Sequence, residues 1–312
     1  MINFRYHVVS LTAVFLSLAI GLVVGTAALN GPVADSLKEQ VNGLRKHNEQ
    51  LREQVNSLTD EVNREEDYVI AAAPLLLDNV LANHRIIVIT LPSGRDHVDG
   101  VVERLRMASA SVTGRIDFQD KFVEPDHDSD LMSLAESAAQ QTVPTDGLPG
   151  NSNGVETSSA LLASALLDRP EGATVAEADR KAVLDAYADA GYLSVADNKI
   201  SGPAEAVVVV SGQSYVDRNA AQKDAAVVTM VSQFDKVAPL TVAGSGTSSG
   251  NVVSTVRGDP ALSKTVSTVD NANTPMGQVC TALATAEQIK PKKTGHYGLG
   301  DGAIDLLPKP IK

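Results

Sequence analysis

The sequence contains one cysteine, Cys280, and no tryptophan among its 312 residues. A single cysteine excludes an intramolecular disulfide, so cysteine usage does not indicate the compartment in which the protein works. Copper handling favours paired cysteines, clustered methionines or clustered histidines. The six histidines and five methionines are instead scattered, with no H-x-x-x-H pair. The sequence therefore predicts neither a metal site nor a bound cofactor.

Positive charge and aromatic side chains are also scarce. The formal net charge is −12, aromatic residues make up 4% of the chain, and the basic residues form no stripe. Nucleic-acid binding depends on basic surface and on aromatic stacking, so we expect no nucleic-acid partner. The chain also lacks a G-x-S-x-G motif and an evident nucleophile–base pair. We therefore predict a protein that is not an enzyme, with no catalytic residues and no small-molecule substrate.

Charge is absent altogether from residues 8–30, a run of 23 mostly apolar residues. As a helix this run is about 34 Å long, enough to cross a hydrocarbon core of about 30 Å. We predict a transmembrane helix over 8–30. The alternative is a cleaved signal peptide, because small residues at positions 25–28 resemble a cleavage site.

The charges that flank this run predict its orientation. Arg5 precedes it, and Asp35 is the first charged residue after it. The positive-inside rule then places residues 1–7 in the cytoplasm and everything after Asn30 outside the cell membrane, as a single-pass protein. Ser17, Gly21 and Gly25 recur at four-residue spacing. Small residues at this spacing favour close packing with a second membrane helix.

A heptad repeat follows and predicts a parallel coiled coil over residues 35–73. Valine at the a positions with leucine at the d positions favours two strands, and one asparagine at an a position fixes the register. Pro74 is expected to end the helix. The simplest arrangement is a homodimer. Two alternatives stay open: a coiled coil with a different protein, and an amphipathic helix that lies on its own globular domain. The seam residues are Leu37, Val41, Leu44, Asn48, Leu51, Val55, Leu58 and Val62.

Residues 84–312 alternate short β-branched runs with helical patterns. This alternation predicts a Rossmann-like α/β domain with a mostly parallel sheet. A turn-rich loop or linker at 143–154 is expected to be an insertion, with two subdomains split near residue 150 as the alternative. The predicted strands are 85–91, 111–123, 206–211, 240–243 and 265–269; the predicted helices are 97–109, 128–141, 158–167, 175–190, 220–234, 251–257 and 276–289.

Three further motifs have a functional and a purely structural interpretation. The loop 244–250 resembles a dinucleotide fingerprint but lacks the acidic residue that should follow, which favours a flexible loop. The acidic stretch 124–130 could bind calcium or cap a helix. The glycine-dense tail 295–302 could present His296 and Tyr297 to a partner, or it could cover the core.

The opening INFRYHVVSLTAVFLSLAIGLVVG, the heptads and the ending GHYGLGDGAIDLLP resemble the actinobacterial MctB family, labelled copper transport outer membrane protein. The resemblance covers the whole chain, and within the family it points to the corynebacterial SteB branch. For that branch it implies a membrane-anchored envelope protein that pairs with a SteA-like protein in cell separation. Such a protein controls peptidoglycan cleavage without cleaving anything itself. For the MctB name it implies a role in lowering cellular copper.

These implications leave two main hypotheses. The first is a non-enzymatic, dimeric, membrane-anchored envelope protein that acts through a partner in cell separation. The alternative is a copper-homeostasis protein of the envelope, and an exported α/β enzyme is a third class. The coil suits a protein partner, and the scattered soft ligands argue against direct copper binding. The residues therefore favour the first hypothesis.

Overall fold

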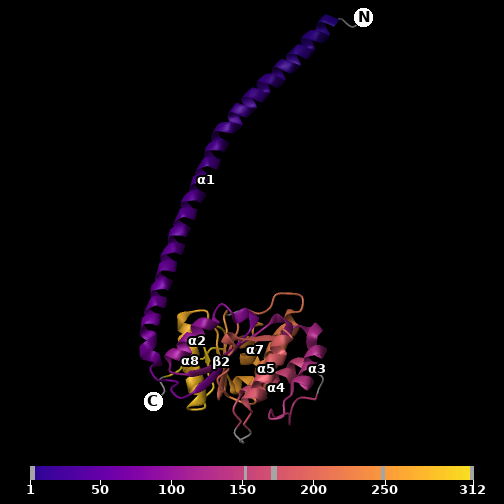
Figure 1. Ribbon diagram of the computed structural model, residues 1–312. Helices are drawn as coiled ribbons and strands as arrows, with labels where there is room; N and C mark the ends of the chain where they lie inside the picture. Colours follow the sequence, from indigo (N-terminus) through magenta and orange to yellow (C-terminus); the bar gives the residue numbers. More distant parts are fainter. Residues whose placement is uncertain (1–3, 151–152, 170–173, 247–249, 310–312) are drawn as a thin grey trace. The chain divides into compact units, whose positions relative to one another are not determined.

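The computed structural model describes residues 4–150, 153–169, 174–246 and 250–309 (Figure 1). The chain divides into two units, Met1–Glu65 and Glu66–Lys312. Parts of the predictions for the N-terminus, the 143–154 loop and the 244–250 loop fall on residues 1–3, 151–152 and 247–249, which lie outside the described residues. The second unit holds the sheet, so residues on both sides of position 150 belong to one domain.

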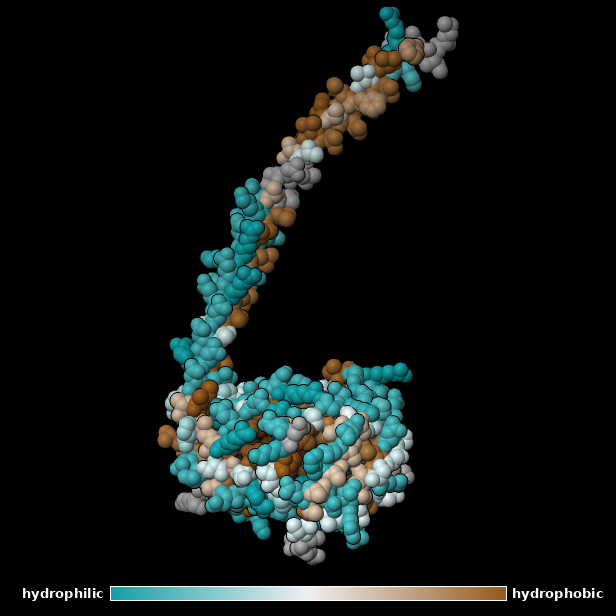
Figure 2. All heavy atoms as spheres, in the orientation of Figure 1, coloured by the Kyte–Doolittle hydropathy of each residue, from teal (hydrophilic) through white to brown (hydrophobic). Residues whose placement is uncertain are grey.

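The first unit is formed by helix α1, which runs from Phe4 to Leu77 and continues into the second unit. Over Phe4–Ala27 the helix is long and apolar enough to cross a membrane, by length and composition. Figure 2 shows apolar side chains on all visible sides of this part. The predicted N-terminal apolar helix is therefore confirmed. Ser17, Gly21 and Gly25 lie within it, and a Cβ added at either glycine would contact nothing within 4 Å.

The heptad residues lie on α1 and are all exposed, from Leu37 to Val62. Figure 2 shows apolar residues along one side of this part of α1 and polar residues along the other. One side of the helix is therefore a row of exposed leucine and valine side chains, interrupted by Asn48. The structure contains one chain, so the pairing of this seam with a second helix stays a prediction.

The prediction that Pro74 ends the helix is wrong. Helix α1 continues to Leu77, although a proline inside a helix removes one backbone hydrogen bond. The last turns pack onto the second unit, where Ala73 and Leu77 are fully buried and Val69 lies against the same cluster. This burial offsets the cost of the proline. Val69, which continues the seven-residue spacing of Val55 and Val62, is partly buried against this cluster, so the fully exposed part of the seam ends at Val62.

The described part of the second unit forms one seven-stranded sheet with the order β3-β2-β1-β4-β5-β6-β7. All neighbouring strands are parallel except β3, which is antiparallel to β2. The prediction of a mixed α/β fold with a mostly parallel sheet is confirmed. The strands are β1 (Arg85–Thr90), β2 (Ser111–Phe118), β3 (Leu193–Val195), β4 (Ala206–Val210), β5 (Leu240–Ala243), β6 (Val266–Val269) and β7 (His296–Tyr297).

The helices of this unit match the predicted helices to within a few residues. The largest difference among the helices is at α4, which begins four residues before its predicted start. Among the strands, β2 ends at Phe118, five residues before its predicted end, and a short 3-10 turn follows it. Strands β3 and β7 were not predicted. The helices are α2 (Val98–Met107), α3 (Asp128–Ala138), α4 (Gly154–Leu166), α5 (Glu177–Asp189), α6 (Ala220–Asp235), α7 (Val252–Gly258) and α8 (Pro275–Ile289).

Helices cover both faces of the sheet (Figure 1). Successive strand residues point to opposite faces. On β1, Ile87 and Ile89 face α3–α7, whereas Ile86 and Val88 face α2, α8 and the end of α1. Because both faces are buried, the central strands read as continuous apolar runs rather than as alternating ones. The core therefore lies in two layers, one on each side of β1, β4 and β5.

Candidate functional site

The strand order places a topological switch point between β1 and β4. From β1 the chain builds outward through β2 to β3, and from β4 it builds in the opposite direction through β5 and β6 to β7. The loops that follow β1 and β4 therefore leave the sheet on opposite sides and open a crevice at the carboxyl ends of the strands. Open α/β sheets bind ligands at this position.

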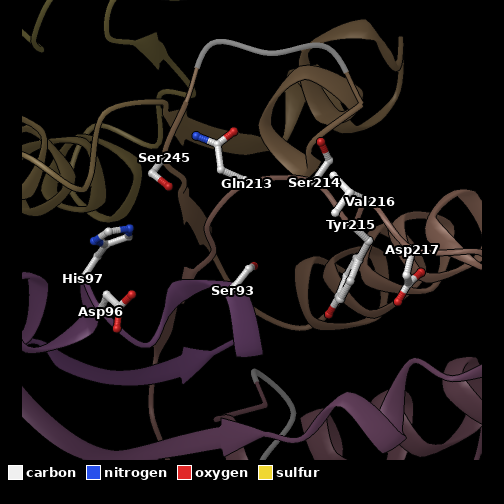
Figure 3. A pocket seen from close by; sticks show the side chains of 9 residues that line it. All are labelled: Ser93, Asp96, His97, Gln213, Ser214, Tyr215, Val216, Asp217 and Ser245. Atoms are coloured by element: carbon white, nitrogen blue, oxygen red, sulfur yellow. The ribbon is translucent and has the colours of Figure 1, made fainter.

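A crevice of about 410 Å³ lies at this edge. The loop after β1 contributes Ser93, Asp96 and His97, the loop after β4 contributes residues 213–217, and the loop after β5 contributes Ser245. Figure 3 shows Ser93, His97, Gln213 and Ser245 around one open space. The first segment lies more than a hundred positions before the other two. Of these residues only Ser245 belongs to a motif that the sequence suggested, the 244–250 loop, and none was predicted as a site residue.

Two glycines hold the first two loops together. The Ser93 hydroxyl accepts a hydrogen bond from the Gly212 backbone at 3.0 Å, and the Leu91 amide donates to the Val210 carbonyl at 2.9 Å. A Cβ on Gly94 would collide with the Val210 carbonyl, and a Cβ on Gly212 would collide with the Ser93 carbonyl. Glycine at both positions allows the two backbones to approach, which fixes the floor of the crevice.

The glycine-rich loop after β5 has a packing role at its described residues. A Cβ on Gly244 would meet Val253 of α7, and one on Gly246 would meet the Gln213 amide. Gly246 also has a φ of +91°, in the region that favours glycine. These glycines let the loop approach α7 and the crevice, which gives a structural reason for the motif without a nucleotide.

One buried lysine anchors the wall formed by residues 213–217. Lys223 of α6 pairs with Asp217 at 2.6 Å and with Glu124 at 2.5 Å. The hydrogen bond to Asp217, followed by that to Glu124, raises the pKa of Lys223, and the bond to Lys223 lowers the pKa of Asp217. Burial raises the pKa of Tyr215 to about 12. At neutral pH Lys223 is therefore a charged, paired side chain behind the wall, and Tyr215 in the wall is a neutral phenol.

Comparison with known families bears on the whole chain. The family described as "Copper transport outer membrane protein, MctB" matches residues 1–308. The chain belongs to the MctB family. It is 28% identical over 321 residues to proteins named copper transporter MctB from Mycobacterium bovis and Mycobacterium tuberculosis, covering 98% of this chain and 99% of theirs. The protein of that name from Mycobacterium leprae is 27% identical over 327 residues, with the same coverage. The more specific resemblance to SteB stays a prediction.

The C-terminal tail of this MctB-family chain buries its tyrosine. Tyr297 is 2% exposed and packs with Val269, Cys280 and Ala284. Its hydroxyl donates to Glu287, and His296 pairs with Thr268 of β6 through its ring nitrogen at 2.9 Å. Of the two interpretations left open for the tail, the burial of Tyr297 agrees with a tail that covers the core, where strand β7 completes the sheet edge. Presentation of His296 and Tyr297 to a partner stays a prediction.

A buried ion pair fixes the tail in place. Arg257 of α7 pairs with Asp270 at 2.8 Å, and the two side chains are 5% and 2% exposed. Arg257 also donates to the Tyr297 carbonyl at 2.7 Å, and Asp270 accepts from the backbone amides of Leu299 and Gly300. The pair therefore satisfies tail backbone groups that lie about 30 to 40 positions away.

The acidic stretch 124–130 has structural partners in this MctB-family chain. Glu124 pairs with Lys223, and Asp128 accepts from the Gly154 amide at 2.9 Å, at the start of α4. His127 lies 3.5 Å from Asp130. Among the described residues, histidine, cysteine, aspartate and glutamate form no group of three or more that could hold a metal ion. The helix-capping interpretation therefore accounts for Asp128, although it caps α4 rather than the helix that follows it in sequence.

Cys280 is buried on α8 and lies close to the tail. Its thiol donates to the Leu306 carbonyl at 3.5 Å. Burial raises the pKa of the thiol, so the reactive thiolate is disfavoured. Beyond this contact the side chains of Leu299, Ile304, Leu306 and Leu307 are exposed. The tail therefore buries its tyrosine and leaves a set of aliphatic side chains at the surface.

Proposed function

We propose that this chain is a membrane-anchored envelope protein that takes part in copper homeostasis. The end-to-end match with copper transporter MctB proteins supports the proposal, because it covers 98% of this chain and 99% of the relatives. A match of this extent includes the apolar helix, the heptad segment and the α/β unit together. We propose that all three parts contribute and that the protein has no catalytic role.

We further propose that α1 forms a parallel homodimeric coiled-coil rod, and that the second unit is a Rossmann-like domain. The exposed seam from Leu37 to Val62 supports the rod, because burying it against a second helix would remove a row of leucines and valines from water. The strand order through β3-β2-β1-β4-β5-β6 supports the Rossmann-like assignment. The antiparallel β3 is the departure from that pattern.

The proposed topology gives the first prediction. A phosphatase reporter that is active only outside the cytoplasm, fused after residue 312, should be active, because Arg5 is expected to keep the N-terminus inside. The same reporter placed ahead of the span should be inactive. Activity would be measured with a chromogenic substrate in intact cells. The reverse pattern would overturn the orientation.

The copper proposal gives the second prediction. Cells that lack this chain should accumulate more copper and grow less well in copper-containing medium than wild-type cells. The native chain should restore both, whereas a chain with Leu51→Glu and Leu58→Glu should not, because charges in the seam prevent pairing of α1. Copper content would be measured by mass spectrometry. A matched chain with Gln50→Glu and Ser57→Glu on the outer side of the helix should restore both; unchanged copper in the deletion strain would refute the proposal.

A second candidate function is cell separation through a SteA-like protein, with control of peptidoglycan cleavage. The exposed seam favours it, because a row of apolar side chains offers a surface to a protein partner. The same deletion strain distinguishes the two functions. Chains of unseparated cells with normal copper content would favour cell separation, and elevated copper in normally separated cells would favour copper homeostasis.

A further inference from the structure

We propose that the crevice at the carboxyl ends of β1, β4 and β5 binds an uncharged, hydroxyl-rich ligand of the carbohydrate class. The inference is independent of copper homeostasis and of the pairing of α1. It follows from the lining of the crevice and from its charge, and buried polar side chains near the ends of the same strands accompany them.

The lining is suited to hydroxyl groups. A volume of about 410 Å³ is within the usual range for small-molecule sites, about 300–1,000 Å³. The side chains of Ser93, His97, Gln213 and Ser245 surround its open space (Figure 3). Hydroxyl and amide groups can each both donate and accept, and an imidazole offers two ring nitrogens for hydrogen bonding. A sugar hydroxyl has the same dual character, so it can donate to or accept from groups of this kind.

The charge of the crevice argues against an anionic ligand. Phosphate and carboxylate sites use arginine or lysine to form charge-assisted hydrogen bonds. Among the described residues, the side chains that line the crevice include the carboxylates of Asp96 and Asp217 and no lysine or arginine. Lys223 lies behind the wall, where Asp217 and Glu124 already hold its ammonium group. A neutral ligand avoids repulsion from Asp96 and can donate to its oxygens.

Buried polar side chains near the ends of β4 and β6 have hydrogen-bonding capacity that the described part of the protein does not use. Ser211, which is 2% exposed, directly precedes the loop after β4, and its hydroxyl lies 3.2 Å from the Cβ position of Gly244. Asn271, 5% exposed, lies opposite Ser245 in an isolated β-bridge. Neither side chain has a hydrogen-bond partner among the described residues.

Unpartnered groups of this kind are costly. Leaving a buried donor or acceptor unsatisfied costs about 1–3 kcal/mol, so such groups in a native protein call for a ligand or ordered water. Thr90, at the end of β1, has a third such group, a hydroxyl. These three groups lie near the ends of β1, β4 and β6, at the same carboxyl edge of the sheet as the crevice.

The rim provides an apolar contact. Val216 is 97% exposed, which is unusual for an aliphatic side chain in a loop held by an ion pair one residue away. Sugar rings present C–H faces as well as hydroxyl groups. A site that combines a few convergent polar groups with an apolar contact is the general design of small-molecule pockets.

The test uses the full chain in lipid nanodiscs, because maltoside detergents would compete for the site. Saturation-transfer NMR and calorimetry would be run with glucose, lactose, maltose and N,N′-diacetylchitobiose, and with glucose 6-phosphate as the charged match to glucose. At least one neutral sugar should bind, and glucose 6-phosphate should bind more weakly than glucose. Ser245→Ala and His97→Ala should each weaken binding by about three- to tenfold, the effect of one lost hydrogen bond.

Ser133→Ala, on the exposed surface of α3, is the matched control and should leave affinity unchanged. Circular dichroism of each variant would verify its fold, and two crevice variants keep the test decisive if one does not fold. Three results would each overturn the proposal: tighter binding of glucose 6-phosphate than of glucose, equal sugar binding by native chain and crevice variants, and no binding of any sugar at high millimolar concentration. None of them bears on copper homeostasis.

Discussion

A chain comprising residues 35–312 with Leu51→Glu and Leu58→Glu should be monomeric under conditions in which the native fragment is a dimer. Leu51 and Leu58 each contribute about 1.5–3 kcal/mol when they are buried against a second helix. The native dimer would bury four such side chains, two from each chain. Their loss alone should raise the dissociation constant by at least about four orders of magnitude, since each 1.4 kcal/mol is a factor of ten. Sedimentation velocity at several concentrations measures the change without a contribution from the membrane span.

Two variants control for general effects of charge and stability. Gln50→Glu with Ser57→Glu adds the same two charges on the outer side of the helix and should leave the dimer intact. Asn48→Val should have the opposite sign, with tighter association but less defined oligomeric state, because a buried asparagine pair is satisfied in one register only. A native fragment that stays monomeric at its highest soluble concentration would contradict the homodimer.

Replacing Asp270 with alanine should lower the free energy of unfolding by about 3–5 kcal/mol, the usual cost of removing one partner of a buried ion pair. The variant leaves the Arg257 guanidinium without its carboxylate and two tail amides without their acceptor. Urea unfolding followed by circular dichroism is the appropriate measurement, because the chain has no tryptophan.

Asp301→Ala is the matched control, because Asp301 is exposed in the same tail and Arg257 contacts only its backbone carbonyl. Its effect should be within about 0.5 kcal/mol. The double variant Arg257→Met with Asp270→Leu should recover part of the loss, since it removes the unpaired charge, but not all of it, since the tail amides stay unpaired. An Asp270→Ala variant as stable as the native protein would show that the tail does not depend on this pair.

The sheet centre could be predicted because its signal is local. The runs RIIVIT and AVVVV are buried on both faces, and such runs are readable without knowing their neighbours. Strands β3 and β7 have three and two residues, too short for any periodicity, and they exist because a neighbouring strand pairs with them. The helix end at Leu77 was missed for a similar reason. Pro74 is a local signal, and the burial of Ala73 and Leu77 by the domain is not.

The crevice could not be predicted, because it depends on strand order. Alternating strands and helices imply a parallel sheet but leave open which strands are adjacent. Ser93 and Gly212 meet across 119 positions only because β1 lies beside β4. The burial of Tyr297 likewise depends on Arg257, 40 positions earlier, whereas the local glycines made the tail look accessible.

The adjacency of β1 and β4 also determines when the domain can form. Arg85 and Glu205, which join these strands at one end, are 120 positions apart, so the sheet has many contacts of high sequence separation. Contact order of this kind slows folding. In the proposed topology, as the chain emerges on the outer side of the membrane, β1 can pair with β2 early, but its other edge stays unpaired until β4 follows. During that interval the nascent chain carries an unpaired apolar edge of the type that aggregates, and a chaperone that shields residues 85–90 would be needed most before residue 210 appears.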